Sequence, residues 1–241
     1  MFEGKKIGAV IPAGGRGRRI GGARPKQLIR LLGKPILLHT LERFELSPEI
    51  DTIVISVSPE IKDEVEDIVR QSKLSKVSGI VNGGEHRQDS VWNGIDVLEK
   101  ERVDYILIHD AVRPFVTAEC LRGVISESIK HGAAVVAVRP KDTVKQSAEG
   151  GFVGGTLERE NVWIAQTPQG FQFSLIHTAF CRAREEGIYA TDDSSLVERL
   201  GIKVRIVEGS YDNLKISTAE DLEFGDIIAR RFLAAQSRTG Y

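Results

Sequence analysis

The sequence predicts an α/β fold, and two features of the chain support this prediction. Short apolar segments of strand length alternate with amphipathic segments of helical period over most of the 241 residues. The alternation stops at residues 139–161, which contain four glycines and no helical period. Alternating strands and helices favour a mostly parallel sheet with helices on both faces. We therefore predict a Rossmann-like three-layer fold with a mostly parallel, twisted sheet and a projecting β-hairpin arm.

The alternation is clearest in the first half of the chain. Each expected strand is a short apolar run, and the expected strands are residues 6–12, 52–58, 76–82, 104–109 and 133–138. Helices are expected between them, at residues 35–46, 59–72, 88–100 and 117–131. Pro59 suits the first position of a helix, and Gly132 suits the residue that ends one. Ligands of such folds bind beyond the carboxyl ends of the strands, so functional residues are expected there.

Residues 139–161 are predicted to form the hairpin arm, with a disordered surface loop as the alternative. An unsupported two-stranded hairpin is marginal in water, so an ordered arm needs a surface to pack on. A second protomer is the natural candidate, and we expect a homodimer formed through the arm. After the arm we expect strands at 163–166 and 203–208 and helices at 174–186, 192–200 and 218–235. The whole chain, 1–241, is then a single domain with one arm.

Composition narrows the partners and the compartment. The formal net charge is −1, which argues against a broad nucleic-acid surface, so any basic site must be local. No apolar segment approaches the roughly 20 residues that cross a bilayer, and the residues before the first strand are too few for a signal peptide. Cys120 and Cys181 form no C-x-x-C pair and are expected to be reduced thiols. These features predict a cytoplasmic protein with no nucleic-acid or membrane partner.

The most informative stretch is "PAGGRGRRIGGARPKQ", residues 12–27, which directly follows the first expected strand. It is not a dinucleotide-binding G-x-G-x-x-G motif, because Ile20 stands where the third glycine is needed. It is not a Walker loop either, because no G-K-[ST] occurs in it. Glycine amides and guanidinium forks both bind phosphate oxygens, so the stretch predicts a phosphate-binding loop. Its cationic residues are Arg16, Arg18, Arg19, Arg24 and Lys26.

This loop resembles that of the nucleotidyltransferases that activate sugar or polyol phosphates, and most of all the 2-C-methyl-D-erythritol 4-phosphate cytidylyltransferase family. Five further blocks match that family in order: "GGEHRQDSVWNG" (83–94), "HDAVRPF" (109–115), "KDTVK" (141–145), "AQTPQGF" (165–171) and "DNLKISTAEDL" (212–222). The chain departs from the family at Gly14, where alanine is common, and at Glu85, where aspartate is frequent. The resemblance implies cytidylyl transfer from CTP to 2-C-methyl-D-erythritol 4-phosphate, giving 4-diphosphocytidyl-2-C-methyl-D-erythritol and pyrophosphate.

Other functions share these motifs and stay open at this point. A ribitol-5-phosphate cytidylyltransferase has the same blocks, and a nucleotidyltransferase that carries a guanylyl group is a more distant possibility. A non-catalytic nucleotide-binding protein of the same fold is a different class. It is disfavoured because every charged position that the resemblance assigns to chemistry is filled.

The implied chemistry depends on positive charge rather than on a general base. A phosphomonoester has a second pKa of about 6 and is mostly ionised at neutral pH, so the attacking oxygen needs no deprotonation. The sequence contains no H-E-x-x-H and no Ser-His-Asp order. Gathering several negative charges and holding them in line is the remaining difficulty. Cationic side chains and Mg²⁺ are expected to meet it.

The resemblance assigns roles to particular residues. Arg19 and Lys26 would neutralise the triphosphate, Lys215 would orient the attacking phosphate, and Arg159 would hold that phosphate, reaching from the arm into the site of a neighbouring protomer. Thr143, Thr167 and Thr191 would complete the polyol phosphate pocket. The cytosine would be recognised by Ala13, Gly14, Gly84, Glu85 and Ser90.

A few neighbouring residues complete the expectations. Asp110 is expected on the metal side, facing a Mg²⁺ that the phosphates hold. Arg87 is expected to brace the nucleotide loop, and His109 to be structural. The acidic residues in "TDDSSLVERLG" (191–201) are explained by a helix N-terminus, where the helix dipole favours negative charge, rather than by a metal cluster.

Overall fold

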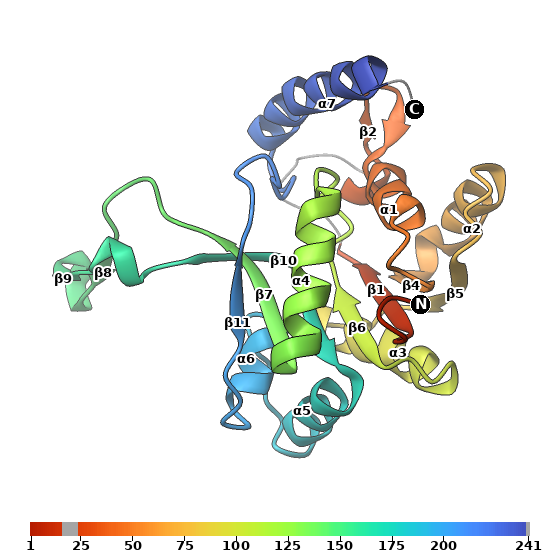
Figure 1. Ribbon diagram of the computed structural model, residues 1–241. Helices are drawn as coiled ribbons and strands as arrows, with labels where there is room; N and C mark the ends of the chain where they lie inside the picture. Colours follow the sequence, from red (N-terminus) through yellow and green to blue (C-terminus); the bar gives the residue numbers. More distant parts are fainter. Residues whose placement is uncertain (16–23, 240–241) are drawn as a thin grey trace.

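The computed structural model describes residues 1–15 and 24–239. Its centre is a seven-stranded sheet with the order β11-β7-β10-β6-β1-β4-β5 (Figure 1). Six strands pair in parallel, and only β10 runs antiparallel to both of its neighbours, β6 and β7. The predicted, mostly parallel sheet is therefore confirmed. The strands are β1 (Ile7–Ala13), β4 (Thr52–Val57), β5 (Val77–Asn82), β6 (Tyr105–Ile108), β7 (Ala133–Val138), β10 (Ile164–Gln172) and β11 (Arg205–Glu208).

Helices cover both faces of this sheet and make the predicted three-layer, Rossmann-like fold. Strand β1 shows the reason, because successive side chains of a strand point to opposite faces. Ala9 and Ile11 belong to the core on one face, and Val10 belongs to the core on the other. The first face carries α1 (Ile36–Leu46), α2 (Lys62–Gln71) and α4 (Ala118–His131). The second face carries α3 (Arg87–Lys100), α5 (Phe173–Glu185) and α6 (Asp193–Glu198).

A smaller core forms where α7 (Ala219–Thr239) packs beside a short hairpin of β2 (Arg30–Leu31) and β3 (Lys34–Pro35), at the top of Figure 1. The hairpin was not predicted. Pro35, expected as the first residue of a helix, pairs with Arg30 across the hairpin, and α1 begins one residue later. Leu32 and Gly33 turn the chain with φ values of 47° and 81°. Gly33 was the residue that could have indicated this hairpin turn from the sequence. Helix α7 also extends beyond the predicted residue 235.

Strand β10 is longer than predicted. The expected strand at 163–166 continues through Gln172 and runs between β6 and β7. Pro168 and Gly170 favoured an earlier end, because proline cannot donate a ladder hydrogen bond. The structure accommodates Pro168 at a shift in the β10–β7 register between Ala165 and Gln169. This irregular part of β10 lies next to the candidate site.

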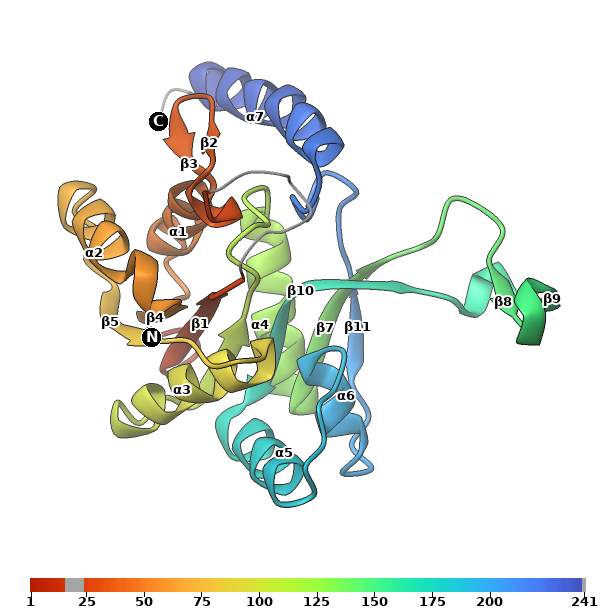
Figure 2. The same ribbon diagram turned by 180° about the vertical axis from the view of Figure 1, so that it is seen from behind.

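The predicted hairpin arm is present and projects away from the body, as Figures 1 and 2 both show. Its strands β8 (Lys145–Ser147) and β9 (Val153–Thr156) pair antiparallel. At its base, the Tyr211 hydroxyl donates a hydrogen bond to the Arg139 carbonyl (2.8 Å), and the Lys141 ammonium lies 4.1 Å from the Tyr211 ring centroid. Near its tip, Phe152 is 74% exposed. The arm therefore leaves the body with a fixed base and an apolar, uncovered end.

The parallel strands bring their following segments together at one edge of the sheet. The segments after β1, β5 and β6 meet there, because these strands all run in the same direction. The chain returns to this edge after β11, where the Ile216 amide donates a hydrogen bond to the Val112 carbonyl (2.9 Å). Within the described residues, no helix is long and apolar enough to cross a bilayer.

Candidate active site

A pocket of about 190 Å³ lies beyond the carboxyl ends of the parallel strands. The loops after β1, β5 and β6 form its wall, with the side chains of Lys26, Gln27 and Lys215. The residues expected at the nucleotide and its phosphates meet here. Those that line it are Ala13, Gly14, Lys26, Gly84, Glu85, Ser90, Asp110 and Lys215.

The loop between β5 and α3 requires glycine and is held by its own hydrogen bonds. A Cβ atom on Gly84 would lie 2.2 Å from the Cβ of Asp89, so a larger residue does not fit. The Asp89 carboxylate accepts a hydrogen bond from the His86 amide (3.0 Å) at the start of α3. The Ser90 hydroxyl accepts from the Gly84 amide (3.1 Å) and donates to the His86 carbonyl (3.2 Å). In this structure Ser90 therefore holds the loop in shape.

Gln27 is a pocket residue that sequence reasoning missed. Its side chain is 1% exposed, and its amide nitrogen donates a hydrogen bond to the Ala13 carbonyl (2.5 Å). This contact fixes the end of β1, where the pocket begins. Only its position next to Lys26 in the glycine-rich stretch could have drawn attention to it.

Lys26 lies beside the glycines that follow β1. Its Cε atom would be 3.5 Å from a Cβ atom on Gly15, an ordinary contact distance, so the lysine stem runs alongside this glycine. The ammonium group is thereby at the pocket wall. Arg19, predicted to act with Lys26, lies outside the described residues.

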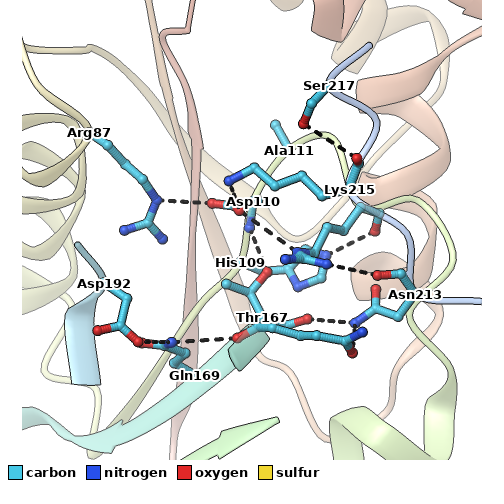
Figure 3. Close-up of polar contacts among 12 residues, drawn as sticks. Arg87, His109, Asp110, Ala111, Thr167, Gln169, Asp192, Asn213, Lys215 and Ser217 are labelled. Atoms are coloured by element: carbon cyan, nitrogen blue, oxygen red, sulfur yellow. Dashed lines mark hydrogen bonds and ion pairs between the residues drawn. The ribbon is translucent and has the colours of Figure 1, made fainter. Parts of the chain in front are cut away.

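Asp110 lies at the centre of a cluster of cations from distant segments (Figure 3). Its Oδ1 accepts a hydrogen bond from the Arg87 Nε (2.9 Å), and its Oδ2 is 2.7 Å from the Lys215 Nζ. The Arg113 Nε is 3.8 Å from the same Oδ2. Burial would raise the pKa of Asp110, but Arg87 and Lys215 outweigh it and lower that pKa well below its ordinary value. Asp110 is therefore a fixed negative charge that holds two cations at the pocket.

Lys215 is positioned by the buried residue two places before it. Asn213 is fully buried, and its side-chain amide donates hydrogen bonds to the Thr167 carbonyl (2.8 Å) and the Gln166 Oε1 (3.1 Å). The Arg113 Nη1 donates to the Asn213 carbonyl (2.8 Å). The segment after β11 is thereby tied to β10 and to the loop after β6. Arg113 therefore braces the Lys215 segment.

His109 is structural, as expected. Its ring is fully buried and lies 5.0 Å from the Phe44 ring, centroid to centroid. Its Nε2 donates a hydrogen bond to the Arg113 carbonyl (3.0 Å), since a carbonyl can only accept. Burial lowers the pKa of His109 to about 4, so the ring is neutral at physiological pH.

The threonines and Arg159 are not brought together in this chain. The Thr167 hydroxyl is buried and accepts a hydrogen bond from the Asp110 amide (3.1 Å), so it fixes the backbone of Asp110. Thr191 lines a neighbouring hollow on the other side of Arg87. Thr143 and Arg159 are exposed residues of the arm and do not line the pocket, and the Arg159 Nη1 donates to the Lys141 carbonyl (3.1 Å).

The pocket offers few donors for a metal. Among the described residues no group of three or more histidine, cysteine, aspartate or glutamate side chains is arranged to hold an ion. Asp110 and Glu85 are the carboxylates of the described pocket wall, and Asp110 is already paired with cations. This donor set fits a Mg²⁺ carried mainly by nucleotide phosphates, which needs one or two carboxylates at most. It does not fit a protein-only metal cage.

The fold and the site together define a class of protein. A parallel sheet whose carboxyl edge carries glycine loops and converging lysine and arginine side chains is typical of α/β enzymes that bind nucleotide phosphates. The family model for 2-C-methyl-D-erythritol 4-phosphate cytidylyltransferase matches residues 7–231. The chain belongs to this family of nucleotidyltransferases.

Individual relatives agree with the family assignment. The 2-C-methyl-D-erythritol 4-phosphate cytidylyltransferase of Syntrophus aciditrophicus is 45% identical over 95% of this chain and 96% of its own length. That of Geotalea uraniireducens is 45% identical over 95% of this chain and 97% of its own length. The crystal structure of the 4-diphosphocytidyl-2C-methyl-D-erythritol synthase of Anaerococcus prevotii matches with a TM-score of 0.85 and 31% identity, covering 95% of this chain and all of that one.

Proposed function

We propose that this protein transfers a cytidylyl group from CTP to 2-C-methyl-D-erythritol 4-phosphate, giving 4-diphosphocytidyl-2-C-methyl-D-erythritol and pyrophosphate. The observation that carries the proposal is the convergence of Arg87 and Lys215 on Asp110 in a glycine-walled pocket that Lys26 also lines, in a chain of this family. The pocket has the charge that a triphosphate and a second phosphate need.

The reaction forms one P–O bond and breaks another. An oxygen of the acceptor phosphate attacks the α-phosphorus of CTP, and pyrophosphate leaves with the bonding pair. The acceptor phosphate is already mostly ionised at neutral pH, with a second pKa of about 6, so no side chain has to remove a proton. His109, the histidine beside Asp110, is fully buried, and its ring Nε2 is hydrogen-bonded to the Arg113 carbonyl. It is therefore not placed to act as a general base, which agrees with a reaction that needs none.

On the nucleotide side, Lys26 would contact the triphosphate, and Arg19 would join it from the glycine-rich stretch. The backbone of Ala13, Gly14 and Gly84, with Glu85 and Ser90, would recognise the cytosine. A Cβ atom on Gly14 would lie 3.3 Å from the Ser90 hydroxyl, so the two loops approach closely.

On the acceptor side, Lys215 would orient the attacking phosphate. Its ammonium already points to the pocket, paired with Asp110, and can exchange this partner for a phosphate oxygen at little cost in position. Removing one well-placed charge donor of this kind costs roughly 3 kcal/mol of transition-state stabilisation, about two orders of magnitude in rate. Thr167 and Thr191 lie near this side of the pocket, behind Asp110 and beyond Arg87.

We propose that Asp110 would help to hold a Mg²⁺ bound mainly by the triphosphate. When bound, it would neutralise phosphate charge and favour departure of pyrophosphate. Asp110 is the carboxylate of the pocket that suits this ion. To contact the ion with its Oδ2, Asp110 would have to give up its ion pair with Lys215.

The arm is proposed to complete the site of a second protomer in a homodimer. Exposed apolar side chains along it, at Phe152, Val153 and Leu157, support an interface, as does the exposed Ile164 at the start of β10. Arg159 and Thr143 are displayed on the same arm, and both would then reach the partner's acceptor phosphate.

The cysteines, Cys120 and Cys181, are both free, which supports the expected cytoplasmic location.

The test is a substrate panel with the purified protein. CTP, Mg²⁺ and either 2-C-methyl-D-erythritol 4-phosphate or ribitol 5-phosphate are supplied, and pyrophosphate release is followed. We expect release with CTP and the methylerythritol substrate, and a loss of about 100-fold in Lys215→Ala. The exposed Lys100→Ala on α3 serves as the matched control. Turnover of ribitol 5-phosphate alone, or no use of CTP, would reject the proposal.

A further inference from the structure

Arg87 joins two carboxylates that belong to different parts of the fold. Its Nε contacts the Asp110 Oδ1 at 2.9 Å, and its Nη1 contacts the Asp193 Oδ2 at 2.8 Å. Arg87 begins α3, Asp110 follows β6, and Asp193 begins α6. The Arg87 side chain lines both the pocket and the neighbouring hollow that contains Asp193. It therefore forms part of the wall between the two.

We propose that Asp193 is a positioning residue for cytidylyl transfer: it holds the Arg87 guanidinium against Asp110 and so fixes the carboxylate that places Lys215 at the acceptor phosphate. This role rests on the proposed function. The sequence explained Asp193 only as an acidic residue at a helix start, and it assigned Arg87 only to the nucleotide loop.

The burial of Asp193 exceeds what a helix start requires. Asp192 already caps α6, since its Oδ1 accepts a hydrogen bond from the Ser195 amide (3.1 Å). Asp193 is 2% exposed, and a carboxylate at such a position is costly unless a cation compensates it. Arg87 is that cation. The planar guanidinium presents several N–H donors in fixed directions, so it can contact two carboxylates at once, which a lysine ammonium cannot do with the same geometry.

The consequence for Lys215 follows from the shared carboxylate. One oxygen of Asp110 contacts Arg87 and the other contacts Lys215, so movement of Arg87 changes the position offered to Lys215. Without the charge at residue 193, Arg87 keeps only Asp110 as an anchor and is free to turn toward the hollow. The nucleotide loop keeps its shape, because its hydrogen bonds join Gly84, His86, Asp89 and Ser90 and do not use the Arg87 side chain.

Steady-state kinetics of three variants test the role. Asp193→Asn removes the charge with little change in volume, and Arg87→Lys keeps the charge but removes the fork. We expect each to lower kcat/KM for the acceptor phosphate about tenfold, as misplacement of a reacting group does. The KM for CTP should change by less than about twofold, since the nucleotide loop is intact. The double variant should be no worse than either single one, because both act through the same contact.

Asp192→Asn is the matched control. It lies one residue away and contacts Gln169, Ser194 and Ser195 rather than Arg87. Asparagine can still cap the helix through its remaining oxygen, so this variant should keep normal kinetics, although it loses the acceptor for the Gln169 amide and should therefore be less stable. An equal loss in Asp192→Asn and Asp193→Asn would show that only the start of α6 matters, and it would overturn the proposal.

A second measurement does not depend on turnover. The Arg87 side-chain Nε–H, observed by NMR, should exchange slowly with solvent in the wild-type protein and in Asp192→Asn, and rapidly in Asp193→Asn. Unchanged kinetics and unchanged exchange in Asp193→Asn would overturn the role of Asp193 alone. A wild-type protein inactive with CTP and every acceptor would instead overturn the proposed function, and this role with it.

Discussion

At the scale of single residues, the site is organised by burial of charge. Asp110 is nearly covered, yet it stays ionised because Arg87 and Lys215 contact its two oxygens. A buried ion pair of this kind is costly to break, by about 3 to 5 kcal/mol when one partner is lost. Such a cluster holds cations in place before the substrates arrive, which is the form of catalysis that phosphate transfer needs.

Burial keeps His109 neutral, whereas Asp110 stays charged, and this neutral histidine leads to a prediction about pH. Its native pKa is about 4, whereas an unfolded histidine titrates near 6.5. As pH falls below about 6.5, the unfolded state binds a proton that the native state does not, so the free energy of unfolding decreases. We expect His109 to account for a loss of about 2 kcal/mol between pH 7 and pH 5, measured by urea unfolding.

His109→Gln should remove this part of the pH dependence. His131→Gln, at a histidine whose side chain is 48% exposed, should leave it in place. An unchanged slope in His109→Gln would show that the buried ring is not the group that titrates.

At the scale of elements, α3 carries the nucleotide loop and packs against the sheet through a glycine. A Cβ atom on Gly94 would lie 2.5 Å from the Val10 Cγ1 and 3.3 Å from the Ser56 hydroxyl. The close approach of α3 to β1 and β4 therefore depends on this glycine. It sets the height of the helix above the strands and hence the position of the loop at its N-terminus.

Gly94→Ala is expected to destabilise the protein by about 1 to 3 kcal/mol through overpacking, even though alanine favours helices by up to about 1 kcal/mol over glycine. Gly123→Ala in α4 is the control, because its Cβ atom would meet only the Val207 Cγ1, at 3.3 Å. That variant should change stability by less than about 1 kcal/mol. Equal losses in the two, measured by urea unfolding, would contradict the packing explanation.

At the scale of the whole molecule, the arm separates two groups of residues that the resemblance assigns to one reaction. Lys26 and Lys215 line the pocket of the body, whereas Arg159 and Thr143 belong to the arm, which projects from the body (Figure 2). A dimer in which each arm reaches the other body would reunite them. The base of the arm is fixed by Tyr211, so its direction is a property of the fold.

Mixing two inactive variants tests this arrangement. Arg159→Ala and Lys26→Ala proteins are expected to be inactive alone and, after subunit exchange, to recover about a quarter of the wild-type rate. Half of random dimers combine the two variants, and each of these has one intact site of two, which gives about a quarter. No recovery, with heterodimers shown to be present, would place Arg159 at the site of its own chain or outside the reaction.

Much of the fold was determined by local sequence. Short apolar runs and helical patterns located the strands and helices of the sheet, because a strand covered on both faces is apolar throughout and a surface helix repeats its apolar side about every 3.6 residues. Residues 12–27 located the phosphate-binding part of the pocket, because glycines and cations next to a strand end bind phosphate, and the family resemblance added the block at 83–94. The same patterns did not predict the β2–β3 hairpin, which depends on the turn at Leu32 and Gly33. They also did not predict the full length of β10, which depends on its pairing with β6 and β7.

The pairings within the site were decided only by the tertiary structure. Arg87 and Asp193 begin two different helices, and Asp110 and Lys215 lie in two different loops, so nothing in their local sequence indicates which carboxylate meets which cation. Their contacts exist because the sheet brings β6 beside β1, and because α6 and the segment after β11 return to the same edge. Composition could supply the charges, but long-range packing decided how they are paired.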